Sequence, residues 1–311
     1  MKKSNLFIVG AAKAGTTSVV SYLSQHSDVF MSPIKEPHYF SKDILRSDYQ
    51  QKRGGKRCFD LKSYLDDEVL RDEHISVVEK KGDYQELYRD ATSEKILGEA
   101  STGYLYSNEA AKEIYDYNEN SKIVIILRDP IERAYSHWKM NLSSGLEERK
   151  YLFIDAVKSD FLKARKGYFV SNLYVELGLY CEQIKRYKSL FPDSTYVLFY
   201  DELVADPACF MGKLHSILGV KAESLDVFSV KNRSKITMFP KIKALAKKMG
   251  VIGVLPRSLK KIIVNKTSNT NFPKLLESDR EYLYSEYFKD EIDALELLLS
   301  CDLSNWKYSK I

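Results

Sequence analysis

Two short stretches of this sequence contain residue types that bind phosphate-like anions. The first places Gly10, Lys13 and Gly15 between an apolar run and a segment with helical spacing of apolar residues. Backbone amides at a glycine turn and at the start of the following helix point toward a ligand, and the helix dipole favours negative charge there. The sequence therefore predicts an anion-binding loop over residues 10–18.

This loop differs at one position from the loop of nucleoside triphosphatases. Gly10, Gly15 and Thr17 fit the pattern GxxxxGK[ST], but Thr16 occupies the lysine position and the lysine stands inside the loop, at Lys13. A nucleoside triphosphatase needs that lysine on the β- and γ-phosphates, beside a hydroxyl that binds magnesium. A phosphosulfate carries less charge, and amides, hydroxyls and one lysine can hold it without a metal. A small-metabolite kinase and a glycine turn without a ligand are the alternatives that the loop alone leaves open.

The second stretch follows the strongest strand signal of the chain, residues 122–127, and contains Arg128 and Ser136. An arginine that leaves the carboxyl end of a parallel strand offers planar donors to a phosphate, at the edge where such sheets bind ligands. Taken alone, Arg128 is also compatible with an ion pair to Asp129 or Glu132, and Ser136 with an ordinary position on a helix.

Together the two stretches resemble the donor-binding motifs of sulfotransferases that use 3'-phosphoadenosine 5'-phosphosulfate (PAPS). Residues 128–136 are similar to the family's 3'-phosphate motif, and residues 13–18 to its 5'-phosphosulfate loop. The similarity covers most of residues 5–220 and is closest to bacterial sulfotransferases and to the glycan sulfotransferases related to heparan sulfate enzymes. One departure is Ala100, where the glycan enzymes often have a lysine.

The resemblance implies a P-loop-like sulfotransferase fold and PAPS as co-substrate, with no metal. It implies sulfuryl transfer to a hydroxyl or amine, foremost on a carbohydrate or glycan, with a small molecule as another acceptor class. The residues that it implies for donor binding are Lys13, Ala14, Gly15, Thr16, Thr17, Ser18, Arg128 and Ser136, together with a basic loop of Lys231, Asn232, Arg233 and Ser234. Tyr180 fits either the core or the neighbourhood of the adenine. A non-catalytic nucleotide-binding module is the alternative from another class.

Sulfuryl transfer needs a group that takes the proton of the acceptor and donors on the leaving phosphate. Lys13 is the expected donor to the leaving phosphate. Glu36 and His38 stand in the loop after the second predicted strand, where glycan sulfotransferases have a glutamate. We therefore expect Glu36 to be the general base, with His38 as the alternative. Without a catalytic role, Glu36 would form an ion pair with Lys35 or Lys13.

The remaining pattern predicts one α/β domain with a central parallel sheet flanked by helices, because apolar strands alternate with helical segments. The expected strands are residues 5–9, 29–31, 96–99, 122–127 and 195–199, and the expected helices include residues 61–70, 109–117, 174–191, 206–218 and one starting near 130. The core is expected over about residues 5–235, followed by a basic lid or acceptor-binding segment over about 231–274 and a C-terminal helix over 275–311.

Composition narrows the partners and the compartment. The chain has 311 residues and a net charge of only +5 from 48 basic and 43 acidic residues, which does not indicate a nucleic-acid binder. Four cysteines stand far apart without CxxC spacing, and the apolar run near the start is too short for a signal or membrane anchor, so a cytoplasmic location is expected. Residues 241–266 are rich in lysine, and a mobile lid, a patch for an anionic glycan and a peripheral membrane contact are the interpretations left open.

Overall fold

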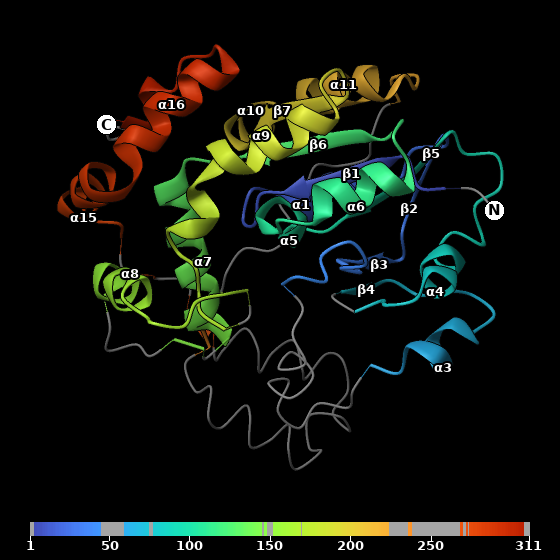
Figure 1. Cartoon of the computed structure of the whole chain (residues 1–311), viewed down its shortest axis with the longest axis horizontal. Helices are drawn as coiled ribbons and strands as arrows, with labels where there is room; N and C mark the ends of the chain where they lie inside the picture. Colours follow the sequence, from blue (N-terminus) through green and yellow to red (C-terminus); the bar gives the residue numbers. More distant parts are fainter. Residues whose placement is uncertain are drawn as a thin grey trace.

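The computed structural model describes residues 3–44, 59–74, 77–144, 146–147, 152–168, 170–223, 236–237, 268–269, 272 and 274–307. Its centre is a five-stranded sheet in which every neighbouring pair of strands is parallel (Figure 1). The strand order is β2-β5-β1-β6-β7, with bounds β1 (Leu6–Gly10), β2 (Val29–Met31), β5 (Ile96–Ala100), β6 (Lys122–Leu127) and β7 (Thr195–Phe199). The predicted α/β class with a central parallel sheet is confirmed.

The central strands form because their sequences are apolar on both faces. Every residue of β1 is buried, and so are the last five residues of β6. A parallel strand covered by helices on both sides reads as such an unbroken apolar run. The two strands pair directly, with Leu6 opposite Lys122 and Ile8 opposite Val124.

Helices cover both faces of this sheet. α6 (Ala110–Tyr117) and α9 (Tyr180–Leu190) pack against each other in front of the sheet in Figure 1. In the sheet, β2 lies on one side of β1, whereas the later connections from β2 to β5, β5 to β6 and β6 to β7 all run in the opposite direction. Connections between parallel strands are right-handed, so α1 (Thr16–Leu23), which joins β1 to β2, lies on the face opposite α6 and α9. There the turn after α1 meets α11, with the rings of His26 and His215 4.7 Å apart. The helices of this second face that follow β7 are α10 (Tyr200–Ala205) and α11 (Pro207–Leu218).

Smaller elements complete the described chain. At one end of the sheet lie α3 (Leu61–Leu65), α4 (Lys81–Glu86) and the parallel pair β3 (Ile34–Lys35) and β4 (Glu73–His74). The antiparallel pair β8 (Ile236–Thr237) and β9 (Ser268–Asn269) is separate from the main sheet. Around the carboxyl ends of the strands lie α5 (Gly103–Tyr106), α7 (Pro130–Ser144), α8 (Phe153–Phe161), η1 (Glu176–Gly178), α15 (Glu277–Leu283), η2 (Tyr284–Phe288), α16 (Lys289–Leu299) and α17 (Ser304–Lys307).

Three helix predictions were too long. The helix expected over 61–70 ends at Leu65, and the one expected over 174–191 becomes regular only at Tyr180, after a short 3₁₀ turn at η1. The C-terminal helix expected over 275–311 is divided, because η2 is a π-helical turn and Ser300 ends α16 in the left-handed region with φ 51°. No helix in the described ranges is long and apolar enough to span a membrane.

Candidate active site

The loop after β1 and the start of α1 present backbone amides at the edge of the sheet. Lys13 and Gly15 both have positive φ, 70° and 82°, and α1 begins at Thr16 directly after Gly15. The first amides of a helix have no carbonyl partner within the helix, so they remain available to a ligand. A side chain at Gly15 would stand 2.9 Å from Leu203 and 3.0 Å from Tyr200, which explains glycine at this position.

Arg128 follows β6, the strand next to β1, and its side chain reaches the same loop. Its Nη1 donates a hydrogen bond to the carbonyl oxygen of Lys13 at 3.1 Å, and its Nη2 lies 3.4 Å from a carboxylate oxygen of Glu132. The guanidinium also lies over the ring of Tyr200, 4.6 Å from the ring centre. The structure therefore brings the two predicted motifs together across adjacent strands. The alternative ion pair with Glu132 exists as well, but Asp129 pairs with Arg280 instead.

One face of α7 lies beside the loop after β1, next to Lys13. The Nζ of Lys13 lies 3.4 Å from the sulfur of Met140, and Ser136 stands one helical turn before Met140 on the same face. Ser136 is half-buried. The predicted 3'-phosphate serine thus projects from the helix face that borders the loop.

The site has an excess of buried positive charge. Burial, together with the charges of Arg128 and Arg133, lowers the pKa of Lys13 to about 8 against the opposing effect of Glu36. Arg133 is fully buried, and in the described structure only its Nη2 has a hydrogen-bond partner, the carbonyl oxygen of Tyr174. Burial and the neighbouring cations also hold the pKa of His137 well below its usual value, so this histidine is neutral. Such a cluster favours an anionic ligand that compensates the charge.

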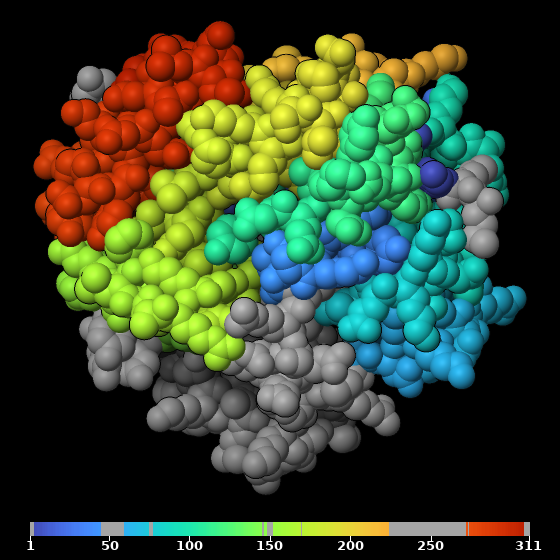
Figure 2. Space-filling view, viewed as in Figure 1, coloured from blue at the N-terminus to red at the C-terminus, as the bar shows by residue number. Residues whose placement is uncertain are grey.

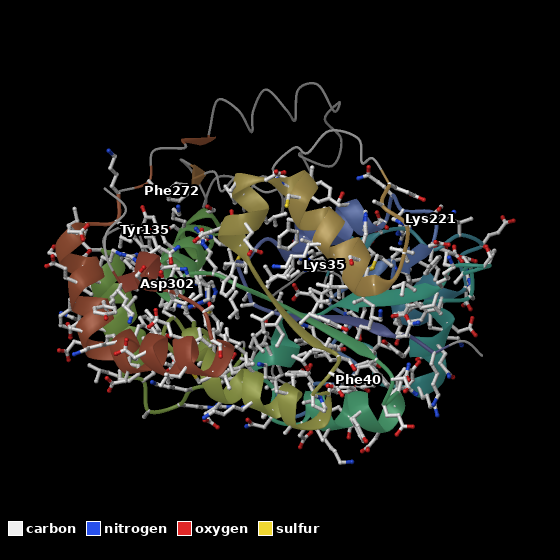
Figure 3. All side chains as sticks on the ribbon, turned by 90° about the horizontal axis from the view of Figure 1, so that it is seen from above. Lys35, Phe40, Tyr135, Lys221, Phe272 and Asp302 are labelled. Atoms are coloured by element: carbon white, nitrogen blue, oxygen red, sulfur yellow. The ribbon has the colours of Figure 1, made fainter. Side chains whose placement is uncertain are left out.

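Glu36 lies at the end of β5, on the other side of β1 from Arg128. Its amide donates to the carbonyl oxygen of Ala100 at 3.0 Å, which fixes it at the carboxyl edge of the sheet. One carboxylate oxygen lies 2.7 Å from the Nζ of Lys35 and accepts from the Thr102 hydroxyl at 3.4 Å; the other lies 3.6 Å from the Nε2 of His38. Figure 3 shows Lys35 in the interior of the molecule rather than at its rim.

These neighbours keep Glu36 ionised. Burial raises the pKa of the carboxyl, but the charge of Lys35 and the nearby ring of His38 outweigh it and hold the pKa well below its usual value. His38 is fully buried, and its Nδ1 lies 3.3 Å from the hydroxyl of Ser41. The side chain of Glu36 is about 10% exposed, whereas that of His38 is 0% exposed.

Several contributors to this site are not evident from the sequence. Tyr200 under Arg128 and Thr102 beside Glu36 lie in stretches that the family resemblance covers, residues 197–203 and 99–104, but the sequence predicts no role for either side chain. Tyr180 is fully buried and its hydroxyl donates to the carbonyl oxygen of Arg128 at 2.9 Å, so it is a core residue that supports the motif. The predicted loop of residues 231–234 and the basic segment 241–266 lie outside the described residues.

The loop after β1, Arg128 after β6 and Glu36 beside the end of β5 thus meet at the carboxyl edge of one parallel sheet, an arrangement suited to an anionic ligand. The chain belongs to the sulfotransferase family, whose model matches residues 5–224.

Individual relatives agree with this family. The chain is 25% identical over 231 residues to heparan sulfate glucosamine 3-O-sulfotransferase 6 from Mus musculus, covering 73% of this chain and 56% of the relative. It is 29% identical over 165 residues to carbohydrate sulfotransferase 15 from Homo sapiens, covering 45% and 28%. The chain therefore spans about half the length, or less, of the curated relatives that it matches.

A solved sulfotransferase from Alicyclobacillus acidocaldarius superimposes with a TM-score of 0.70 at 26% identity, covering 99% of this chain and all of that one. This agreement extends beyond the residues of the family match and includes the C-terminal helices.

Proposed function

We propose that this protein transfers a sulfuryl group from PAPS to a hydroxyl or amine of an acceptor, foremost a carbohydrate. The observation that carries the proposal is the contact between the two donor motifs, in which Arg128 reaches the carbonyl oxygen of Lys13 while Glu36 lies at the end of the strand on the other side of β1. Membership of the sulfotransferase family supports the reaction class.

The residues present fit a ligand with two separate anionic groups. The amides of residues 15–17 at the start of α1, with Lys13, form one anion site, and Arg128 with Ser136 forms the other. The amide of Ser18 already donates to the carbonyl oxygen of Gly15 at 2.9 Å, so only its hydroxyl is available there. Burial and the charges of Arg128 and Arg133 lower the pKa of Lys13, and an anion beside it would oppose the effect of the two arginines. When bound, PAPS would supply the activated sulfuryl group.

Two side chains would act on the reaction itself. Glu36 would accept the proton of the acceptor hydroxyl, since its carboxylate is ionised and partly accessible. Lys13 would donate to the phosphate from which the sulfuryl group departs, and in this way stabilise the charge that develops there. His38 would hold the Glu36 carboxylate from the buried side.

The acceptor class rests on the relatives. Those named above are a heparan sulfate glucosamine sulfotransferase and a carbohydrate sulfotransferase. Ala100 ends β5 and is buried, so no cation occupies the position at which the glycan enzymes often have a lysine. We therefore propose a carbohydrate acceptor whose recognition does not depend on a lysine at this position.

An acceptor screen tests the proposal directly. The protein is incubated with isotopically labelled PAPS and separate pools of oligosaccharides, amino sugars, small phenols and peptides, and products are read by mass spectrometry. We expect labelled product from a carbohydrate pool, and at least about a hundredfold less from Glu36→Gln under the same conditions. Label only in the phenol or peptide pools would overturn the carbohydrate assignment, and no label in any pool, from protein that binds the product nucleotide, would favour a binding module.

A further inference from the structure

The residue after Arg128 is a buried carboxylate with two separate tasks. Asp129 is 1% exposed, and its Oδ1 accepts hydrogen bonds from the amides of Ile131 at 2.9 Å and Glu132 at 3.2 Å. These bonds cap the first turn of α7, the helix that carries Ser136. Its Oδ2 accepts from Nη2 of Arg280 at 2.5 Å.

Arg280 comes from a distant part of the chain. It stands on α15, 151 positions after Asp129, and lies beyond residues 5–224 that the family model matches. It is only 6% exposed, and the same Nη2 donates to the carbonyl oxygen of Trp306 at 2.7 Å. Trp306 is itself buried and its ring meets that of Phe199 at the end of β7. The guanidinium is therefore held from two sides.

The residues on either side of Asp129 are also fixed from the second half of the chain. The carbonyl oxygen of Arg128 accepts from Tyr180. Gly178 packs so closely that an added Cβ would stand 2.9 Å from Pro130 and 3.0 Å from Phe288. Figure 2 shows the C-terminal helices packed directly against residues 153–190, and the contact between Phe161 and Tyr287, with ring centres 4.8 Å apart, belongs to this interface.

We infer that Arg280 is a positioning residue for donor binding, which acts by neutralising Asp129 so that this carboxylate caps α7 and holds Arg128 and Ser136 in register. The inference rests on the proposed function, because it assigns the donor to that edge of the sheet. A buried carboxylate without a counter-charge is costly, so it takes up a proton or turns toward water. Burial already raises the pKa of Asp129, and the charge of Arg280 opposes that rise.

The test compares affinities for the product nucleotide, 3'-phosphoadenosine 5'-phosphate (PAP), by titration calorimetry on the full chain. In Arg280→Met we expect the PAP dissociation constant and the KM for PAPS to rise at least about tenfold, since a buried carboxylate loses its partner. kcat at saturating PAPS should change far less. Arg280→Lys should recover part of the affinity, and Asp129→Asn with Arg280→Met should recover most of it, because asparagine still caps α7 and needs no counter-charge.

Lys307→Met is the matched control, since Lys307 lies in the same C-terminal segment but pairs with Asp293 and Glu296 instead of Asp129. It should leave PAP affinity unchanged. A lower melting temperature in Arg280→Met with wild-type PAP affinity, or no recovery in the double variant, would show a structural role only and overturn the inference. If the wild type itself binds no PAP, the proposed function fails and the inference falls with it.

Discussion

Glu36 and Lys13 lie on opposite sides of the same reaction in the proposed mechanism, so their substitutions should produce different defects. Glu36→Gln removes the proton acceptor and leaves the donor contacts intact. We expect its kcat to fall by about 10²–10⁴, with PAP affinity close to wild type. Lys13→Ala should weaken PAP binding as well as turnover. Normal turnover in Glu36→Gln together with loss in His38→Ala would move the base to His38.

Lys35 sets the ionisation of Glu36, and this makes a pH prediction. Glu36 acts as a carboxylate, so activity is lost as the pH falls through its pKa. In the wild type the pKa of this carboxyl lies well below its usual value, because Lys35 and His38 outweigh burial. Lys35→Met removes the largest effect that opposes burial, so the pKa of Glu36 should rise. The acid limb of the kcat profile should therefore move to higher pH.

Lys42→Met is the control for this profile, because Lys42 is a nearby exposed lysine that pairs with Glu113 at 3.9 Å. It should leave the acid limb in place. An acid limb in Lys35→Met that coincides with the wild type would show that Lys35 does not tune the base.

At the scale of elements, α10 meets the start of α1 at Gly15, and this contact also supports Arg128. A Cβ at Gly15 would press on the Tyr200 ring that lies beneath the guanidinium, and φ is 82° there. Gly15→Ala should therefore weaken PAP binding severalfold and cost about 1 kcal/mol of stability.

Gly82→Ala provides the comparison for that substitution. Gly82 lies in α4, and nothing stands within 4 Å of an added Cβ. It should keep PAP affinity and gain about 0.5–1 kcal/mol of stability. If Gly15→Ala bound PAP as tightly as Gly82→Ala, the contact between α10 and the loop would have no part in the site.

Elements with strong local patterns were predictable, and contacts between distant elements were not. The bounds of β2, β6 and β7 agree with the prediction because their apolar runs end at polar or turn residues. The helix predicted over 174–191 becomes regular only at Tyr180, because Leu179 before it lies outside the helical region, with φ −85° and ψ 80°. Both donor motifs carry a sequence signal, whereas the pair of Asp129 and Arg280 depends on a chain separation of 151 residues.

At the scale of the whole molecule, a buried carboxyl joins β5 to the helices around it. Glu99 is 1% exposed and accepts hydrogen bonds from the hydroxyls of Tyr84, Tyr104 and Ser101. Burial raises its pKa from 4.5 to about 8, against the effect of these hydrogen bonds. The folded protein therefore keeps Glu99 protonated at pH values at which the unfolded chain ionises it.

The free energy of unfolding should then decrease as the pH rises from about 4.5 to about 8, because the unfolded state binds fewer protons in that window. Glu99→Gln removes this dependence, so the difference in stability between pH 5 and pH 8, measured by urea unfolding, should become smaller. Glu86→Gln, at an exposed position of α4, should leave it as in the wild type. An unchanged pH dependence in Glu99→Gln would mean that Glu99 is ionised in the folded protein.

The central claim is that the edge formed by the ends of β5, β1 and β6 binds a nucleotide with a 3'-phosphate and a 5'-phosphosulfate. Thermal unfolding with PAP, and separately with ATP and magnesium, tests it most directly. PAP at a hundredfold its wild-type dissociation constant should stabilise the wild type by about 2.7 kcal/mol. ATP with magnesium should have little effect. At the same PAP concentration, the stabilisation of Arg128→Ala should be smaller. A larger shift with ATP and magnesium than with PAP, or an equal PAP shift in wild type and Arg128→Ala, would contradict the assignment.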